Sequence, residues 1–239
     1  MDEHITILDG MFIVVEGPDG PGKSTQSRLL LHSLQDLGYQ VILTREPGGT
    51  PIGEQIRAVL HDMENTNMAK PTELLLYSAS RSQHIAEIIA PALASGAIVI
   101  CDRFWPSTMA YQCFGRGIPI EDVLLLTRLA CGTFFRPNLV LHLDIDSQTG
   151  LDRKWAAMRA GEPGAEINRL DVEGLAFHMK TRRGYLEMAE WGPKFFGQWS
   201  TLDATAPIDA VHEQILAVVL PFLKRIIEGG GIQRDFGTG

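Results

Sequence analysis

The sequence has few cysteines and no excess of positive charge, and each shortage excludes a class of protein. Only three cysteines occur among 239 residues, Cys101, Cys113 and Cys131, and no two of them form a CxxC pair. A disulfide framework or a cysteine zinc site is therefore not expected, and a reducing cytoplasm suits the chain best. Lys and Arg number 21 against 29 Asp and Glu, which gives a net charge of −8. Proteins that bind a nucleic-acid backbone usually carry a basic face, so no polynucleotide partner is expected.

Long hydrophobic runs are also missing. No uninterrupted apolar run reaches the roughly 18 residues that suggest a membrane helix. The apolar segment 215–227 is interrupted by Pro221, Lys224 and Arg225, and the first residues are acidic rather than basic. Neither a membrane span nor a secretory signal is expected. The hydrophobic fraction of 45% and the charged fraction of 21% are typical of a folded chain rather than a disordered one.

Short β-branched runs alternate with longer segments of helical periodicity along most of the chain. The apolar runs predict strands at 11–16, 40–44, 97–101, 139–143 and 198–203. The helical periods predict helices at 23–37, 52–61, 72–94, 120–131, 148–159, 171–190 and 207–228. Strand followed by helix, with continuously apolar strands, is typical of a parallel sheet covered on both faces. We therefore expect a three-layer α/β/α fold with a central five-stranded parallel sheet.

The strongest local motif follows the first predicted strand. It is the segment Gly17-Pro18-Asp19-Gly20-Pro21-Gly22-Lys23-Ser24-Thr25, which fits G-x-x-x-x-G-K-[ST]. Its glycines allow the backbone to turn tightly and aim N–H groups at a phosphate, next to the positive end of the following helix. Lys23 supplies charge to the donor phosphates, and the Ser24 hydroxyl can bind Mg²⁺. A plain Gly/Pro-rich turn is the alternative, but the flanking strand and helix favour a P-loop nucleotide site.

Two charged clusters come at the ends of the next predicted strands. Arg45 and Glu46 lie in a loop made unusual by one proline and two glycines; alone, this loop is best interpreted as a surface turn with an incidental ion pair. Asp102 and Arg103 end the third strand, where the carboxylate can hold metal-bound water and the arginine can bind a phosphate. A structural Asp–Arg pair is the equal alternative there. Open α/β sheets bind ligands at this edge.

Two further clusters fall on predicted helices. Tyr77 and Arg81 are four residues apart and can face one cavity, or be a half-buried tyrosine and a solvated arginine. Ser107 or Thr108 shares a helix face with Tyr111 and Gln112, whose groups suit a flat heterocycle. An amphipathic helix with a polar outer face is the alternative for these last four residues.

As a set, these clusters resemble the thymidylate kinase family, P-loop enzymes that phosphorylate dTMP. The resemblance is carried by segments 44–50 (TREPGGT), 76–81 (LYSASR), 102–112 (DRF…STMAYQ), 116–117 (RG) and 168–171 (NRLD). It runs from about residue 11 to about residue 223. It implies transfer of the ATP γ-phosphate to dTMP with Mg²⁺ in dTTP synthesis, by a cytoplasmic homodimer. Ser24 and Asp102 are the residues expected at the metal site.

The resemblance also assigns roles around the transferred phosphate. Arg103 would bind the dTMP phosphate, with Arg45 and Glu46 near the transfer centre and Arg57 lining the acceptor pocket. Asp19 matches an acidic loop residue near the sugar and the transferring phosphate.

Other roles concern the base and the sugar. Tyr77 stands where the family has a phenylalanine that stacks on thymine, and Arg81 would donate to a thymine carbonyl. Thr108 and Gln112, beside Ser107 in the substrate pocket, would contact the base edge. Tyr111 would pack against the deoxyribose and disfavour a 2′-hydroxyl.

The resemblance places a lid around residues 153–170, within a single nucleoside monophosphate kinase domain at 1–228. Some members of the family carry an arginine inside the phosphate loop and others carry it in the lid; here the loop has Gly20 and Pro21, which indicates the lid type. Arg153, Arg159 and Arg169 are the candidates, and Arg159 is the first choice to neutralise charge on the transferring phosphoryl group. The Gly/Pro-rich stretch 160–168 is expected to be a mobile loop, and 229–239 a flexible tail.

Departures from the family pattern leave the fine acceptor preference open. Phe104 replaces a usual Tyr or His, Tyr77 replaces Phe, and Cys113 and Phe114 stand where a glycine commonly follows the glutamine. A kinase for another nucleoside monophosphate is one alternative function. Another is a P-loop ATPase or nucleotide-dependent switch without a small acceptor, and a third is an inactive nucleotide-binding module.

Overall fold

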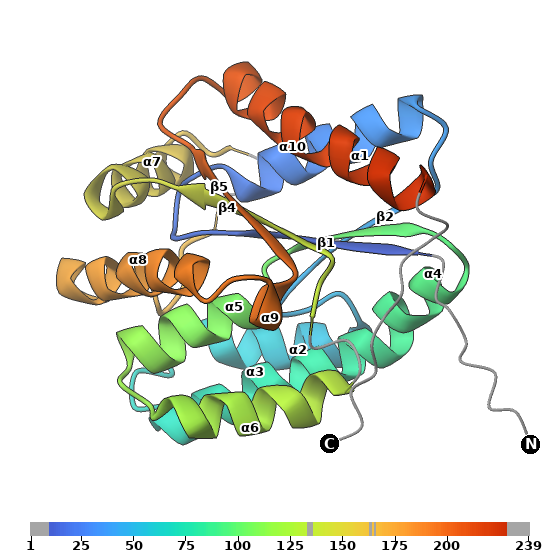
Figure 1. The fold of residues 1–239 in the computed structure, drawn as a ribbon. Helices are drawn as coiled ribbons and strands as arrows, with labels where there is room; N and C mark the ends of the chain where they lie inside the picture. The colour runs from blue at the N-terminus through green and yellow to red at the C-terminus, as the bar shows by residue number, and fades with distance from the viewer. Residues whose placement is uncertain (1–9, 133–135, 163, 165, 229–239) are drawn as a thin grey trace, which may run out of the picture.

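The computed structural model describes residues 10–132, 136–162, 164 and 166–228 (Figure 1). Within these residues one sheet contains the strands β1 (Met11–Glu16), β2 (Val41–Arg45), β3 (Ile98–Asp102), β4 (Leu139–Asp144) and β5 (Gln198–Asp203). Its order is β2-β3-β1-β4-β5, and every neighbouring pair is parallel. The predicted five-stranded parallel sheet is confirmed, with strand boundaries within one residue of those expected.

Helices cover both faces of this sheet. They are α1 (Lys23–Asp36), α2 (Pro51–His61), α3 (Lys70–His84), α4 (Ala90–Ala94), α5 (Trp105–Thr108), α6 (Ile120–Cys131), α7 (Ser147–Arg159), α8 (Leu175–Glu190), α9 (Pro193–Phe196) and α10 (Ile208–Glu228). Helices α1 and α10 lie on one face, and α3, α6 and α8 on the other (Figure 1).

The alternation of side chains along β1 explains this arrangement. Phe12 and Val14 belong to a buried apolar cluster with residues of α3, α6 and α8, whereas Ile13 and Val15 belong to a second cluster with residues of α1 and α10. Successive side chains of a strand point to opposite faces, so a continuously apolar strand must be covered on both. The three-layer architecture follows from this burial.

Several element boundaries differ from the sequence prediction. The helix expected at 72–94 begins at Lys70 and contains a π-helical turn, Ile85–Ile89, before α4. The helix expected at 171–190 begins only at Leu175, because Asp171 accepts a hydrogen bond from the Asn168 backbone and closes a turn instead. Helix α5 continues into a π-helical segment, Met109–Gly115, and α9 was not expected. Helical periodicity cannot detect such short or irregular turns.

Some expectations lie outside the described residues. The tail 229–239 does, and so do positions 163 and 165 of the expected loop 160–168. Within the described part of the chain, every helix is too short or too polar to cross a membrane.

Parallel strands bring the predicted site residues to one edge. Arg45 of β2 is in register with Asp102 of β3, and Asp102 is also in register with Val15 of β1. The loop after β1 and the residue after β3 therefore leave the sheet side by side.

Candidate active site

The loop between β1 and α1 is shaped to hold phosphate groups. Gly20 and Gly22 have φ angles of 81° and 89°, which only glycine adopts readily. A Cβ on Gly20 would lie 1.8 Å from the carbonyl oxygen of Gly150, so no larger residue fits where α7 passes the loop. Lys23 is buried at the start of α1, and its Nζ donates to the carbonyl oxygen of Pro18 at 2.5 Å. The lysine side chain is thus held inside the loop.

Ser24 and Asp102 form a pair of oxygen donors beside Lys23. The Ser24 hydroxyl donates to Asp102 Oδ2 at 2.5 Å, and all three residues line one cavity. Mg²⁺ binds such hard oxygens, usually one or two from the protein together with waters and substrate phosphates. The donor set therefore fits the expected metal. No separate cluster of three or more potential metal ligands occurs among the described residues.

Arg103 follows β3 and directs its guanidinium at the phosphate loop. Nη1 donates to the carbonyl oxygen of Gly17 at 3.1 Å, and Nη2 donates to Asp19 Oδ1 at 2.8 Å. Its φ of 71° lies in the left-handed region, where a side chain is strained by roughly 1–3 kcal/mol. Such strain persists only where surrounding contacts determine the conformation. The two predicted anion-binding elements therefore face each other across one cleft.

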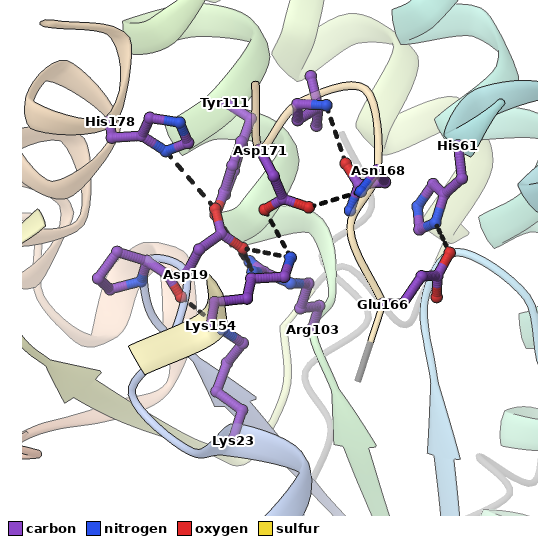
Figure 2. A network of polar contacts seen from close by, with 12 residues as sticks. Asp19, Lys23, His61, Arg103, Tyr111, Lys154, Glu166, Asn168, Asp171 and His178 are labelled. Atoms are coloured by element: carbon purple, nitrogen blue, oxygen red, sulfur yellow. Dashed lines mark hydrogen bonds and ion pairs between the residues drawn. The ribbon is translucent and has the colours of Figure 1, made fainter. Parts of the chain in front are cut away.

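Asp19 is the centre of a buried polar network (Figure 2). The Tyr111 hydroxyl donates to its Oδ2 at 2.6 Å, and Lys154 Nζ and His178 Nδ1 lie 3.6 and 3.7 Å from its carboxylate oxygens. Burial opposes ionisation of Asp19, but the charges of Lys154, Arg103 and Lys23 outweigh it and hold the pKa of this carboxyl well below its usual value. Asp19 is therefore an anion that accepts hydrogen bonds.

The residues expected to contact a base surround a second part of the cavity. Arg81 is buried; its Nε donates to Glu46 Oε2 at 2.8 Å and its Nη2 donates to Thr108 Oγ1 at 2.9 Å. Among the described residues, its Nη1 is buried and has no hydrogen-bond partner. A buried donor without a partner is costly, so a ligand acceptor at this end of the cavity would stabilise Nη1. Tyr77 and Gln112 line the same cavity.

The loop after β2 does not hold an incidental ion pair between its two charged neighbours. Arg45 donates to Glu54 Oε2 at 2.9 Å with half of its side chain exposed, whereas Glu46 is buried against Arg81. Arg57 of α2 donates to the carbonyl oxygen of Pro47 at 3.0 Å. These three predicted residues all line the cavity, but Glu46 is held in a structural ion pair.

The three candidate lid arginines have different surroundings. Arg159 is exposed on α7 and does not line the cavity. Arg153 donates to the carbonyl oxygens of Ala204 and Thr205 at 2.7 and 3.1 Å. Arg169 is buried in an ion pair with Glu73. The structure thus brings Arg153 to the cavity and leaves Arg159, the expected first choice, outside it.

One cavity of about 850 Å³ joins the phosphate loop to the acceptor residues. Of the predicted site residues it is lined by Asp19, Gly20, Pro21, Gly22, Lys23, Ser24, Thr25, Arg45, Glu46, Arg57, Tyr77, Arg81, Asp102, Arg103, Ser107, Thr108, Tyr111 and Gln112. Gly17 and Pro18 contribute their carbonyl oxygens to Arg103 and Lys23. A space of this size is suited to two small ligands whose phosphates meet between Lys23 and Arg103.

Comparison with known proteins agrees with this geometry. The family model described as thymidylate kinase matches residues 15–215. The chain belongs to the thymidylate kinase family. It is 47% identical to the thymidylate kinase of Trichlorobacter lovleyi, over 88% of this chain and 97% of that protein. It is 44% identical to that of Roseiflexus sp. strain RS-1, over 90% of this chain and 96% of the relative.

A solved structure extends the comparison to the fold. The crystal structure of thymidylate kinase from Ehrlichia chaffeensis superimposes with a TM-score of 0.69 at 30% identity, covering 88% of this chain and 98% of that one. Membership of the thymidylate kinase family confirms the expected P-loop α/β fold and the expected activity, phosphorylation of dTMP by ATP.

Two residues that no motif indicated, Glu16 and Lys154, hydrogen-bond or pair with residues of the site. Glu16, at the end of β1, accepts from the Phe104 backbone at 2.7 Å, from Ser107 Oγ at 2.6 Å and from the Tyr185 hydroxyl at 3.1 Å. Burial raises the pKa of the Glu16 carboxyl. A glutamate that ends a wholly apolar strand was the available signal. The first two bonds attach the segment after Arg103 to β1, and the third attaches α8.

Lys154 is the other missed residue. Its Nζ bonds Asp171 Oδ1 at 2.5 Å, close to Asp19 (Figure 2). The family resemblance implies an arginine in the segment 153–170, and no sequence motif marks the neighbouring lysine. Within the described part of segment 153–170, it is the cation that reaches the phosphate loop's carboxylate.

Proposed function

We propose that the chain performs the thymidylate kinase reaction by holding ATP in the loop 17–25 and dTMP against Arg103, in the single cavity between them. The main support for this proposal is that Arg103 Nη1 and Nη2 donate to Gly17 and Asp19 of that loop. Two anions bound at these positions share one cleft, so the acceptor phosphate oxygen can attack the γ-phosphorus in line. The protein contributes mainly position and charge, since phosphoryl transfer needs little covalent chemistry.

The donor side consists of backbone amides and Lys23, with Ser24 and Asp102 proposed to hold Mg²⁺. When bound, that ion neutralises charge on the donor phosphates. Lys23 holds the β- and γ-phosphates. The lid around residues 153–170 excludes water during transfer, and Arg153 or Arg159 is its proposed cation.

On the acceptor side, Arg103 holds the dTMP phosphate, with Arg45 and Arg57 nearby. The base lies against Tyr77 and accepts from the unpaired Nη1 of Arg81. Thr108 and Gln112 contact the base edge, beside Ser107. Tyr111 packs by the deoxyribose, and its hydroxyl donates to Asp19 there.

A panel of nucleoside monophosphates with ATP tests this assignment. We expect dTMP to be the best acceptor, with kcat/KM roughly tenfold or more above that for dCMP and purine monophosphates, because a base pocket built on hydrogen bonds rejects mismatched edges. ADP should form only when an acceptor is present. Rapid ADP formation without acceptor would indicate an ATPase, and an equal rate with every monophosphate would reject the dTMP assignment.

Binding of the donor should take up a proton. Burial, together with the charge of Arg103, lowers the pKa of Lys23 to about 7. At about pH 8 the empty site therefore holds mostly neutral lysine, and bound phosphates favour its charged form, so up to one proton enters per site. At about pH 6 the lysine is already charged, and uptake should vanish.

Calorimetric titration of a non-hydrolysable ATP analogue in two buffers of different ionisation enthalpy measures this uptake. Lys23→Arg is the matched control, since a guanidinium stays protonated throughout and should take up no proton. Equal uptake in the wild type and in Lys23→Arg would place the titrating group elsewhere.

We also propose that the protein is a cytoplasmic homodimer. Leu75 of α3 and Leu125 and Leu129 of α6 are 53%, 68% and 81% exposed, and these helices pack side by side at the lower surface (Figure 1). Exposed leucines on two neighbouring helices are suited to a second copy. The three cysteines are free thiols, as in a reducing compartment. A monomeric mass in sedimentation equilibrium would refute the dimer.

A further inference from the structure

One buried carboxylate lies behind the base pocket and has no role in the reaction described above. Glu73 is 1% exposed on α3, four residues before Tyr77 and eight before Arg81, on the face that these two share. Its Oε1 accepts from Gln112 Nε2 at 2.9 Å. Gln112 is itself buried and lines the cavity.

Two arginines hold Glu73 in place as an anion. Arg116 Nε donates to Oε1 at 3.1 Å and its Nη2 donates to Oε2 at 3.2 Å, while Arg169 Nη2 donates to Oε2. Burial opposes ionisation, but hydrogen bonds from Arg116, Gln112 and Arg169 outweigh it and lower the pKa of the Glu73 carboxyl. An ionised carboxylate only accepts hydrogen bonds.

This chemistry leaves one orientation for the Gln112 amide. Because Glu73 accepts, the NH₂ group of Gln112 must face it, and the amide oxygen makes no hydrogen bond within the part of the chain that is described. That oxygen is the group left for the cavity. An oxygen there accepts from the N3–H of thymine or uracil, whereas cytosine presents a lone pair at N3 and would meet no donor.

We propose that Glu73 is a positioning residue that fixes the orientation of the Gln112 amide and so selects pyrimidines that carry a hydrogen on N3. This inference rests on the proposed function, in which Gln112 contacts the base edge. Arg169 belongs to the segment after the lid, so the same carboxylate also ties that segment to the base pocket.

The variant Glu73→Gln tests the proposal. Arg116 and Arg169 have only donors, so they would hydrogen-bond to the oxygen of the new amide. The new NH₂ group would then face Gln112 and donate to it, which would rotate the Gln112 amide by about 180°. The Gln112 NH₂ would then face the base. We expect the ratio of kcat/KM for dTMP to that for dCMP to fall about tenfold or more.

Two controls separate positioning from a general structural effect. Glu173→Gln removes a carboxylate that accepts from Arg116 and, among the described residues, shares no hydrogen bond with Gln112; it should change the ratio by less than about twofold. In a Gln112→Leu background, Glu73→Gln should not change the ratio further. Equal losses with both acceptors, or a ratio change that persists in Gln112→Leu, would overturn the proposal. A wild type inactive on dTMP would instead reject the proposed function.

Removing a buried charge that two arginines share can prevent folding, so the wild type provides a second test. In ¹⁵N-labelled protein, a side-chain N–H of Gln112 should be protected from exchange with water both before and after dTMP is added, because it faces Glu73. Protection that arises only with dTMP would mean that the nitrogen faces the base, and it would overturn the proposal.

Discussion

Replacing Lys23 with alanine is expected to lower kcat for dTMP phosphorylation about a thousandfold, while the fold is retained. The ammonium is buried within the phosphate loop, where water cannot replace it. A fixed charge in a site that excludes water stabilises developing phosphate charge far more than one in water does. A loss of three powers of ten corresponds to about 4 kcal/mol of transition-state stabilisation.

Steady-state kinetics with saturating dTMP measures this loss. Lys180→Ala is the matched control, because this lysine is exposed on α8 and does not line the cavity. The control should turn over at the wild-type rate, and the circular dichroism of both variants should match the wild type. Turnover by Lys23→Ala within tenfold of the wild type would show that the donor phosphates lie elsewhere.

Replacing Arg103 with alanine should reduce kcat/KM for dTMP about a thousandfold and leave ATP binding nearly unchanged. The guanidinium is the cation between the two halves of the cleft, and its removal takes a charged donor from the acceptor phosphate. Asp19 keeps the Tyr111 hydroxyl and Lys154 as partners, so the phosphate loop retains its support.

In Arg103→Ala, ATP binding and dTMP kinetics should respond differently. The Kd of an ATP analogue should stay within about threefold of the wild type, whereas KM for dTMP rises or kcat falls. Arg183→Ala removes an exposed arginine paired with Glu187 one turn away on α8, and it should alter neither value. A variant that loses ATP and dTMP binding equally would show that Arg103 supports the loop rather than the acceptor.

Much of this protein could be predicted from local patterns. Apolar runs such as 11–16 form strands because they are buried on both faces, and the sheet has the expected five. The phosphate loop could be predicted because backbone turning and the charge of Lys23 depend on residues that are neighbours in the chain. The segments 44–50, 76–81 and 102–112 likewise identified residues that line the cavity.

Other assignments depended on contacts that no local pattern contains. Glu46, expected near the transfer centre, lines the cavity, but its buried ion pair with Arg81, 35 residues away, could not be predicted from spacing. Arg159 was expected over the phosphoryl group but is exposed outside the cavity, while Lys154 lies beside Asp19. Spacing on a helix shows which residues share a face, but not what that face meets.

By itself, then, the sequence determined the sheet, the phosphate loop and the set of side chains around the cleft, because burial and backbone turning act between near neighbours. The tertiary structure alone decided which charges meet. Arg103 reaches Asp19 across 84 residues, and Gln112 and Arg169 reach Glu73 across 39 and 96. A hydrogen bond requires its two atoms within about 3 Å, and only the folded chain brings such distant residues that close.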